Sequence, residues 1–205
     1  MSYEFDQDPQ VKEFALRVRN FINTEVIQHE PELNPDSHGI NPNLRVVLQD
    51  KARAANVFAP TAPKEFGGHG FNHVAQAVIL EESGRSLLGP TALNCAAPDE
   101  GNILLLNKIA TPDQRAKYLA PLSRGEIRSS FSMTEPSPGA GADPNLLLTS
   151  AEKTKSGWVI NGNKWLITGA DGAGFSIVMA KTSGGATMFL VDAENPGMKV
   201  VRSLD

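Results

Sequence analysis

RSSFSMTEPSPGAGAD, residues Arg128 to Asp143, is the stretch around which the chain is organised. Polar and apolar residues alternate from Ser130 to Thr134, which predicts a strand with Phe131 and Met133 on one face. Two prolines and two glycines then end the strand: Pro136, Pro138, Gly139 and Gly141. A glycine-rich loop of this kind can turn backbone N–H groups toward an electron-rich ligand atom. It is also typical of a plain turn.

The residues before this stretch have helical periodicity. Apolar residues recur at intervals of three and four in five segments: Asp8–Glu30, Asn43–Ala55, Asn72–Ser86, Asn94–Lys108 and Thr111–Ser123. Thr111, Pro112 and Gln114 form a capping-box pattern at the start of the last segment. Proline and glycine interrupt the intervening stretches 31–42 and 57–71, which are therefore predicted to be loops.

The residues after Gly125 change to the period of strands. Asn161-Gly162 is the pair favoured by a two-residue hairpin, so we expect Trp158–Ile160 and Lys164–Thr168 to flank such a turn. Three more strands are expected over Phe175–Lys181, Thr187–Val191 and Met198–Val201. The predicted fold class is therefore α+β, with an N-terminal all-α domain followed by a β-barrel-like domain.

Composition excludes several classes of protein. The 205 residues are 40% hydrophobic and 20% charged, with a formal net charge of -4, and no Lys/Arg cluster is longer than a pair. We therefore expect no nucleic-acid partner. No apolar run approaches the roughly 20 residues of a membrane span, and the acidic start does not resemble a secretory signal. The single cysteine, Cys95, excludes an intrachain disulfide. These features favour a cytoplasmic location.

Several motifs, in order along nearly the whole chain, resemble the acyl-CoA dehydrogenase family. They are PKEFGG (63–68), EESGR (81–85), QRAKYLAPLSRGE (114–126), FSMTEP (131–136) and NGNKWLITGA (161–170). Together with PDEGN (98–102), they resemble the branch found in the dehydrogenase portions of larger animal fusion proteins. Several ordered motifs are far more specific than any one of them alone.

The resemblance implies a fold of three parts, namely an N-terminal helical domain, a middle β-domain and a C-terminal helical bundle. Residues 1–126 would be the first and residues 127–205 all or part of the second, with the C-terminal bundle absent. The family binds FAD and oxidises acyl-CoA thioesters to trans-2-enoyl-CoA in fatty acid metabolism. The implied partners are an acyl-CoA substrate, an electron-transferring flavoprotein, and further copies of the chain or its missing C-terminal half. The implied catalytic glutamate lies in the C-terminal domain, so no catalytic residue is expected in this chain, and the isolated chain is expected to be inactive.

The resemblance also implies a set of cofactor-binding residues on two motifs. Phe131, Met133 and Thr134 would lie along the edge of the isoalloxazine ring, Leu166 on its face, and Thr168 near flavin N5. Gly141 and Ala142 occupy a loop where the family commonly has serine before Asp143, so backbone N–H groups would replace its contact. The family's flavin-stacking tryptophan aligns with Leu166, and Trp165 stands one place earlier. Trp165 therefore either packs in the core or contacts the flavin.

Other candidate residues have simpler interpretations. Glu135 is expected to order its loop by accepting N–H bonds instead of acting as a base. His69 and His73 have a spacing that suits a metal, but no third ligand is evident, so a solvated pair and no metal site are expected. Two alternative functions remain open at this point. One is a flavin-dependent monooxygenase of the same fold, and the other is a non-catalytic remnant that binds a partner.

Overall fold

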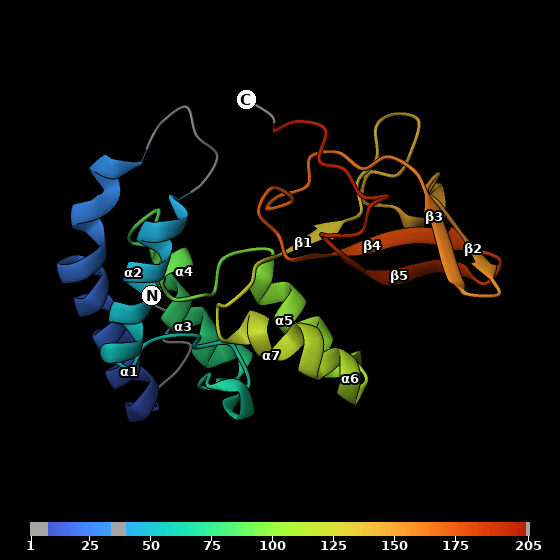
Figure 1. Ribbon diagram of the computed structural model, residues 1–205. Helices are drawn as coiled ribbons and strands as arrows, with labels where there is room; N and C mark the ends of the chain where they lie inside the picture. Colours follow the sequence, from blue (N-terminus) through green and yellow to red (C-terminus); the bar gives the residue numbers. More distant parts are fainter. Residues whose placement is uncertain (1–7, 34–39, 204–205) are drawn as a thin grey trace, which may run out of the picture. The chain divides into compact units, whose positions relative to one another are not determined.

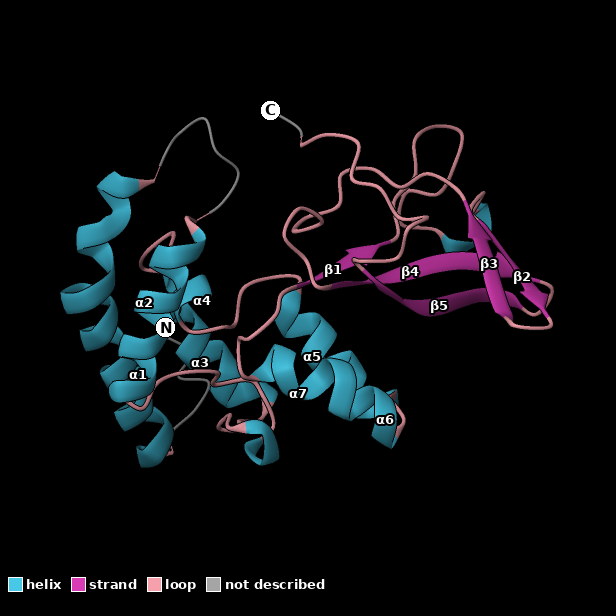
Figure 2. Cartoon of the chain, in the orientation of Figure 1, coloured by secondary structure: helices cyan, strands magenta, loops and turns pink. Residues whose placement is uncertain are grey.

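A computed structural model describes residues 8–33 and 40–203 of the chain (Figure 1). They form two compact units, one ending at Glu126 and the other beginning at Ile127. Helices make up the first unit and a sheet makes up the second (Figure 2), which confirms the predicted α+β class. Part of the predicted loop 31–42 lies outside the described residues.

The first unit begins with a helix whose winding changes along its length. Helix α1 (Pro9–Phe21) starts at Asp8, whose side chain accepts a hydrogen bond from the Gln10 N–H. The chain then continues through a π-helical turn, Ile22–Val26, and a 3₁₀ turn, Ile27–Glu32. The apolar side chains of α1 that are buried follow the predicted helical stripe: Val11, Phe14, Ala15, Val18 and Phe21.

The remaining helices of the first unit follow the sequence pattern with two exceptions: the short helix Gly89–Ala92 was not predicted, and one helix starts later than predicted. They are α2 (Pro42–Ala54), α3 (His73–Ser83), α4 (Gly89–Ala92), α5 (Asp99–Ile109), α6 (Pro112–Gln114) and α7 (Ala120–Ser123). The predicted helix Asn94–Lys108 begins only at Asp99. Asn94 has a left-handed φ of 54°, and a proline at position 98 disfavours helix in the residue before it. The capping box of Thr111 and Gln114 is confirmed at the start of α6.

The second unit is an open mixed sheet and not a closed barrel among the residues described. Its strands are β1 (Ser129–Ser132), β2 (Ser150–Thr154), β3 (Gly157–Asn161), β4 (Phe175–Thr182) and β5 (Gly185–Asp192). Strand β4 is central, because it pairs in parallel with β1 and antiparallel with β5, and meets β2 at Lys181. Its residues Phe175, Ile177 and Ala180 are buried. The outer hairpin is β2–β3.

The predicted hairpin around Asn161-Gly162 is wrong. Strand β3 pairs with β2, which precedes it, and the turn between them follows Thr154, opposite Gly157. Residues 162–168 contain no strand. Gly162 instead packs so closely on Thr149 that a Cβ would lie 2.2 Å from the threonine hydroxyl. The expected strand Met198–Val201 is also absent from this described part of the chain.

We predict that Gly162→Ala destabilises the second unit by about 1–3 kcal/mol, because the added methyl group overlaps the Thr149 side chain and backbone. Chemical denaturation followed by circular dichroism measures this loss. Gly184→Ala is the matched control, since a Cβ there meets only the Thr182 hydroxyl at 3.7 Å. Equal stability of the two variants would contradict the packing argument.

Candidate functional site

Six of the eight sequence-predicted site residues lie in two segments of the second unit. Phe131 lies within β1, and Met133 and Thr134 directly follow the strand. Trp165, Leu166 and Thr168 lie in the strand-free segment after β3. The first three are half-buried and the last three are exposed.

Thr134 and Trp165 join the two segments through two hydrogen bonds. The Trp165 N–H donates to the Thr134 carbonyl at 3.1 Å, and the Thr134 hydroxyl donates to the Trp165 carbonyl. The two hydrogen bonds resemble those between paired residues of neighbouring strands, although neither residue lies in a strand. Thr168 lies three positions further along the segment that Trp165 belongs to. The structure thus brings the FSMTEP and NGNKWLITGA motifs together at this point.

Trp165 and Leu166 present apolar surface to solvent. Trp165 is 48% exposed and Leu166 is 60% exposed, so Trp165 is not a core residue. Leu166 has a left-handed φ of 55°, a conformation that bulky residues rarely adopt. A strand would reverse the face from one residue to the next, but residues 162–168 form no strand, so that argument about Trp165 does not apply.

Glu135 orders the loop after β1, as the sequence predicted. It is buried, and its carboxylate accepts N–H bonds from Leu148 at 2.7 Å, Thr149 at 2.9 Å and Ala140 at 3.2 Å. The Lys164 ammonium donates to the same carboxylate at 2.8 Å and to the Met133 carbonyl at 2.8 Å. Glu135 is therefore the centre of a buried network that links the loop to the segment after β3.

The ionisation of this pair follows from its surroundings. Burial alone would raise the pKa of the Glu135 carboxyl, but the hydrogen bonds from Lys164 and from residues 148–149 outweigh burial and lower the pKa well below its ordinary value. Burial lowers the pKa of the Lys164 ammonium, while Glu135 opposes that shift. Glu135 therefore stays ionised near neutral pH, and its carboxylate oxygens already accept hydrogen bonds from Lys164 and three backbone N–H groups.

Lys164 is the residue that the sequence argument missed. The sequence feature that could have indicated it is a lysine directly before the apolar run Trp-Leu-Ile, in a chain that also has a glutamate in the TEP motif. A lysine whose side chain is only 11% exposed needs an anionic partner. The partner could not be named from sequence, because the two residues are 29 positions apart.

Gly141 and Ala142 lie apart from this network in the exposed part of the loop. A Cβ added at Gly141 would meet nothing within 4 Å, so packing does not require a glycine there. Asp143 next to them accepts a hydrogen bond from the Asn145 N–H and caps a short 3₁₀ turn, Pro144–Leu146. Among the described residues no hydrogen bond ties Gly141 or Ala142 to Thr134 or Trp165.

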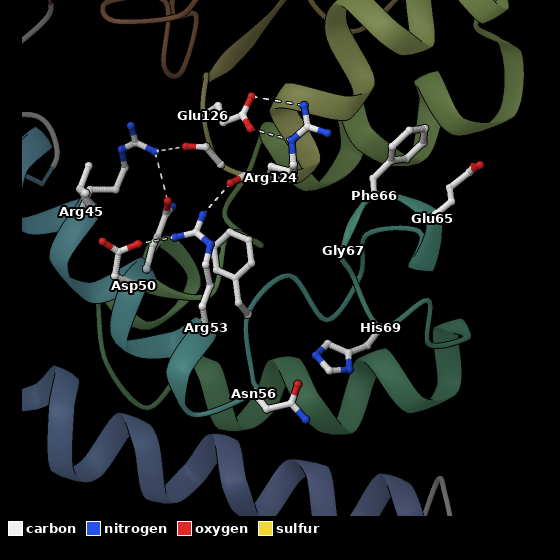
Figure 3. A pocket seen from close by; sticks show the side chains of 14 residues that line it. Arg45, Asp50, Arg53, Asn56, Glu65, Phe66, Gly67, His69, Arg124 and Glu126 are labelled. Carbon is white, nitrogen blue, oxygen red and sulfur yellow. Dashed lines mark hydrogen bonds and ion pairs between the residues drawn. The ribbon is translucent and has the colours of Figure 1, made fainter.

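The first unit contains a separate cavity of about 780 Å³ with a polar wall (Figure 3). Arg45, Arg53 and Arg124 line it, with Asp50, Glu65 and Glu126 as acidic neighbours. Arg53 also lies over the Phe58 ring, 3.9 Å from its centroid. Figure 3 shows the side chains of Arg45 and Arg53 directed toward the chain around Arg124, with His69 on the opposite side of the cavity.

Arg45 and Arg53 cap the C-terminal end of α7. Arg53 donates to the Arg124 carbonyl at 2.6 Å, and Arg45 donates to the Gly125 carbonyl at 2.9 Å. Asn94 donates to the two preceding carbonyls, of Leu122 and Ser123, at 3.1 Å each. Carbonyl groups at a helix C-terminus lack partners within the helix and attract cations. The basic wall of the cavity therefore has a structural explanation in helix capping.

His69 is not part of a solvated pair, so that prediction is wrong. Its ring lies 4.6 Å from the Phe14 ring centroid and 5.9 Å from that of Phe71. Burial lowers the pKa of the imidazole, and the positive charges of Arg17 and Lys64 lower it further. No group of three or more potential metal ligands occurs in residues 8–33 and 40–203.

Cys95 is a packing residue in this structure. It is buried and free, and burial raises the pKa of its thiol to about 12. The thiolate needed for nucleophilic chemistry is therefore scarce near neutral pH. Within the part of the chain that the structure describes, no helix has the length and apolar character needed to cross a membrane.

Comparison with known proteins identifies the family. Residues 8–126 match the acyl-CoA dehydrogenase N-terminal domain, and residues 130–205 match the acyl-CoA dehydrogenase middle domain. The chain therefore belongs to the acyl-CoA dehydrogenase family. It is 41% identical to the probable acyl-CoA dehydrogenase FadE2 of Mycobacterium tuberculosis, over 98% of this chain and 52% of that protein. It is 34% identical to mouse acyl-CoA dehydrogenase family member 10, over 96% of this chain and 20% of that protein.

Solved structures agree with this assignment. A structure from Mycobacterium abscessus assigned as an acyl-CoA dehydrogenase is 32% identical, with a TM-score of 0.83 over 98% of this chain and 54% of its own. An acyl-CoA dehydrogenase from Bacillus anthracis, solved with FAD, is 26% identical, with a TM-score of 0.77 over 100% of this chain and 34% of its own. The chain thus spans about a fifth of the length of the mouse relative and about half that of the Mycobacterium tuberculosis relative.

The depressed pKa of His69 predicts a pH-dependent stability. The unfolded chain takes up a proton as the pH falls through about 6.5, before the folded chain does. This contribution to stability is therefore present above that pH and is lost below it. Denaturant titrations at pH 7.5 and 5.5 should show a smaller loss of stability for His69→Gln than for the wild type. The difference should be below about 1.4 kcal/mol, because pH 5.5 lies about one unit below the ordinary histidine pKa and solvent screens a half-buried ring.

His73→Gln is the matched control for this experiment, because it removes an exposed imidazole from the start of α3. We expect it to leave the pH dependence of the wild type in place. A wild type and His69→Gln that lose equal stability on acidification would contradict the assignment to His69.

Proposed function

We propose that this chain forms one wall of the FAD site of an enzyme that dehydrogenates acyl-CoA thioesters between the α and β carbons. The observation that carries the proposal is the contact of Thr134 with Trp165, beside which Trp165 and Leu166 are exposed. Support comes from the family membership and from the FAD complex of the Bacillus anthracis relative.

The chemistry of these residues fits the isoalloxazine group. An indole and a leucine side chain offer apolar surface for a planar ring system, and the hydroxyl of Thr134 and the exposed Thr168 offer polar contacts for its edge. Exposed apolar side chains of this size next to hydroxyl groups are typical of a surface that another group covers. Phe131 and Met133 add half-buried apolar surface from the other segment.

When bound, FAD would supply the hydride acceptor for the β-hydrogen of the substrate. Thr134 has committed its proton to the Trp165 carbonyl, so its oxygen keeps lone pairs that can accept a hydrogen bond. Trp165 and Leu166 would exclude water from the ring that they touch, which strengthens nearby polar contacts. Thr168 would orient the ring edge through its own hydroxyl.

We do not assign the catalytic base to Glu135. Its carboxylate is buried, ionised and saturated by Lys164 and three backbone N–H groups, so it is not free to take a substrate proton. We propose that the base and the rest of the FAD site come from outside this chain, either from a C-terminal part or from a further copy. An electron-transferring flavoprotein as acceptor and a cytoplasmic location complete the proposal.

Replacing Trp165 tests the proposed wall. We predict that Trp165→Ala weakens FAD binding about tenfold, because it loses one aromatic contact worth roughly 1.4 kcal/mol. Equilibrium dialysis of the purified protein against FAD measures the dissociation constant. Trp158→Ala is the matched control, since Trp158 is 46% exposed in β3 and lies outside the candidate site. Equal affinities of the two variants would contradict the proposal.

Anaerobic reduction then tests the reaction itself. Protein that has bound FAD is mixed with an acyl-CoA, together with any partner part that the affinity measurement shows to be necessary. Loss of the oxidised flavin absorbance supports dehydrogenation, whereas bleaching only by a separate reductant and recovery with oxygen favours a monooxygenase. Folded protein that binds no FAD in any combination would overturn the proposed function.

A further inference from the structure

Lys164 connects the two candidate cofactor-binding segments through its side chain. Its ammonium donates to the Met133 carbonyl and to the Glu135 carboxylate, and these two acceptors flank Thr134 in the sequence. Lys164 itself directly precedes Trp165. With the two hydrogen bonds between Thr134 and Trp165, four hydrogen bonds join residues 133–135 to residues 164–165.

The sheet does not set the spacing of these segments. Strand β1 ends at Ser132, and its register with β4 ends at the same residue. Residues 162–168 have left the β2–β3 hairpin and contain no strand. Backbone groups that lack a ladder partner must find other partners. At the Met133 carbonyl, the partner is the Lys164 ammonium.

Leu166 provides a second observation that this segment is constrained. It keeps a left-handed φ of 55° although its side chain is 60% exposed, so burial of the side chain does not explain the conformation. Such a backbone persists only where surrounding contacts over-determine it. The anchored residues Lys164 and Trp165 lie directly before Leu166 and supply those contacts.

We propose that Lys164 is a positioning residue for the FAD site. It holds the Met133–Glu135 segment at a set distance from Trp165 and Leu166 before the cofactor arrives. This inference rests on the proposed function, because it is FAD that the two segments would contact. A preformed surface binds its ligand with a smaller loss of conformational freedom. Removal of the ammonium therefore weakens binding without removing any atom that touches the ligand.

Tryptophan fluorescence tests the positioning role without FAD. The chain has two tryptophans, so Trp158→Phe leaves Trp165 as the only one. In that background, Lys164→Met should raise the quenching of Trp165 by acrylamide, because the Trp165 backbone is held less firmly beside Thr134 and the indole gains freedom. The same variant should bind FAD about tenfold more weakly, the effect of roughly one lost hydrogen bond.

Two further variants separate positioning from general destabilisation. Ala180→Gly removes a buried methyl group from β4 at a position that pairs with Thr187 of β5 and not with β1, so it lowers the stability of the sheet. It should leave Trp165 quenching and FAD affinity unchanged. Lys164→Arg keeps a positive charge for Glu135 but cannot place a compact ammonium between two acceptors. It should raise the quenching even where Lys164→Met does not fold.

The outcomes distinguish this inference from the proposed function. Unchanged Trp165 quenching in both Lys164 variants overturns the positioning role, whatever FAD does. Raised quenching with an unchanged FAD dissociation constant overturns the link between Lys164 and the cofactor. A folded wild type that binds no FAD, either alone or together with a partner part, refutes the proposed function and the role toward FAD as well. The quenching still reports whether Lys164 holds the segment. Raised quenching together with weakened FAD binding, neither of them in Ala180→Gly, supports the inference.

Discussion

A buried ion pair holds the second unit of this protein together where its sheet does not reach. Glu135 and Lys164 have side chains that are 2% and 11% exposed, and their atoms lie 2.8 Å apart. Two charges in such a place are costly to desolvate, and further hydrogen bonds to each charge help to offset that cost. Three backbone N–H groups donate to the carboxylate, and the ammonium also donates to the Met133 carbonyl.

The consequence of the pair lies in geometry more than in stability. A buried ion pair often contributes less to stability than apolar side chains of similar volume would. Here it closes the loop after β1 and anchors the segment after β3 at the same point. The candidate cofactor-binding residues Thr134 and Trp165 are immediate neighbours of the two charged residues. The surface that we propose for FAD therefore adjoins, along the chain, a buried network that fixes both of its segments.

The first unit uses charge in a different way. The carbonyl groups of Ser123, Arg124 and Gly125 at the end of α7 accept hydrogen bonds from Asn94, Arg53 and Arg45, which lie elsewhere in the unit. Cations at a helix C-terminus are favoured by the helix dipole. These contacts hold the last residues of the unit, and they account for the basic wall of its cavity. An arginine-rich cavity in this family member is therefore no sign of an anionic ligand by itself.

The amino-acid sequence alone determined the class of fold, the helical periods, the capping box at Thr111, and the family, because these depend on local spacing and on ordered motifs. It also indicated that Glu135 orders its loop. It could not determine that Asn161-Gly162 ends a strand instead of turning a hairpin, since the local preference of that pair is overridden by the β2–β3 register and by contact with Thr149. Nor could the sequence predict that Lys164 pairs with Glu135, or that the Trp165 side chain is exposed. Those features arise only when residues far apart in the chain meet, so the tertiary structure decided them.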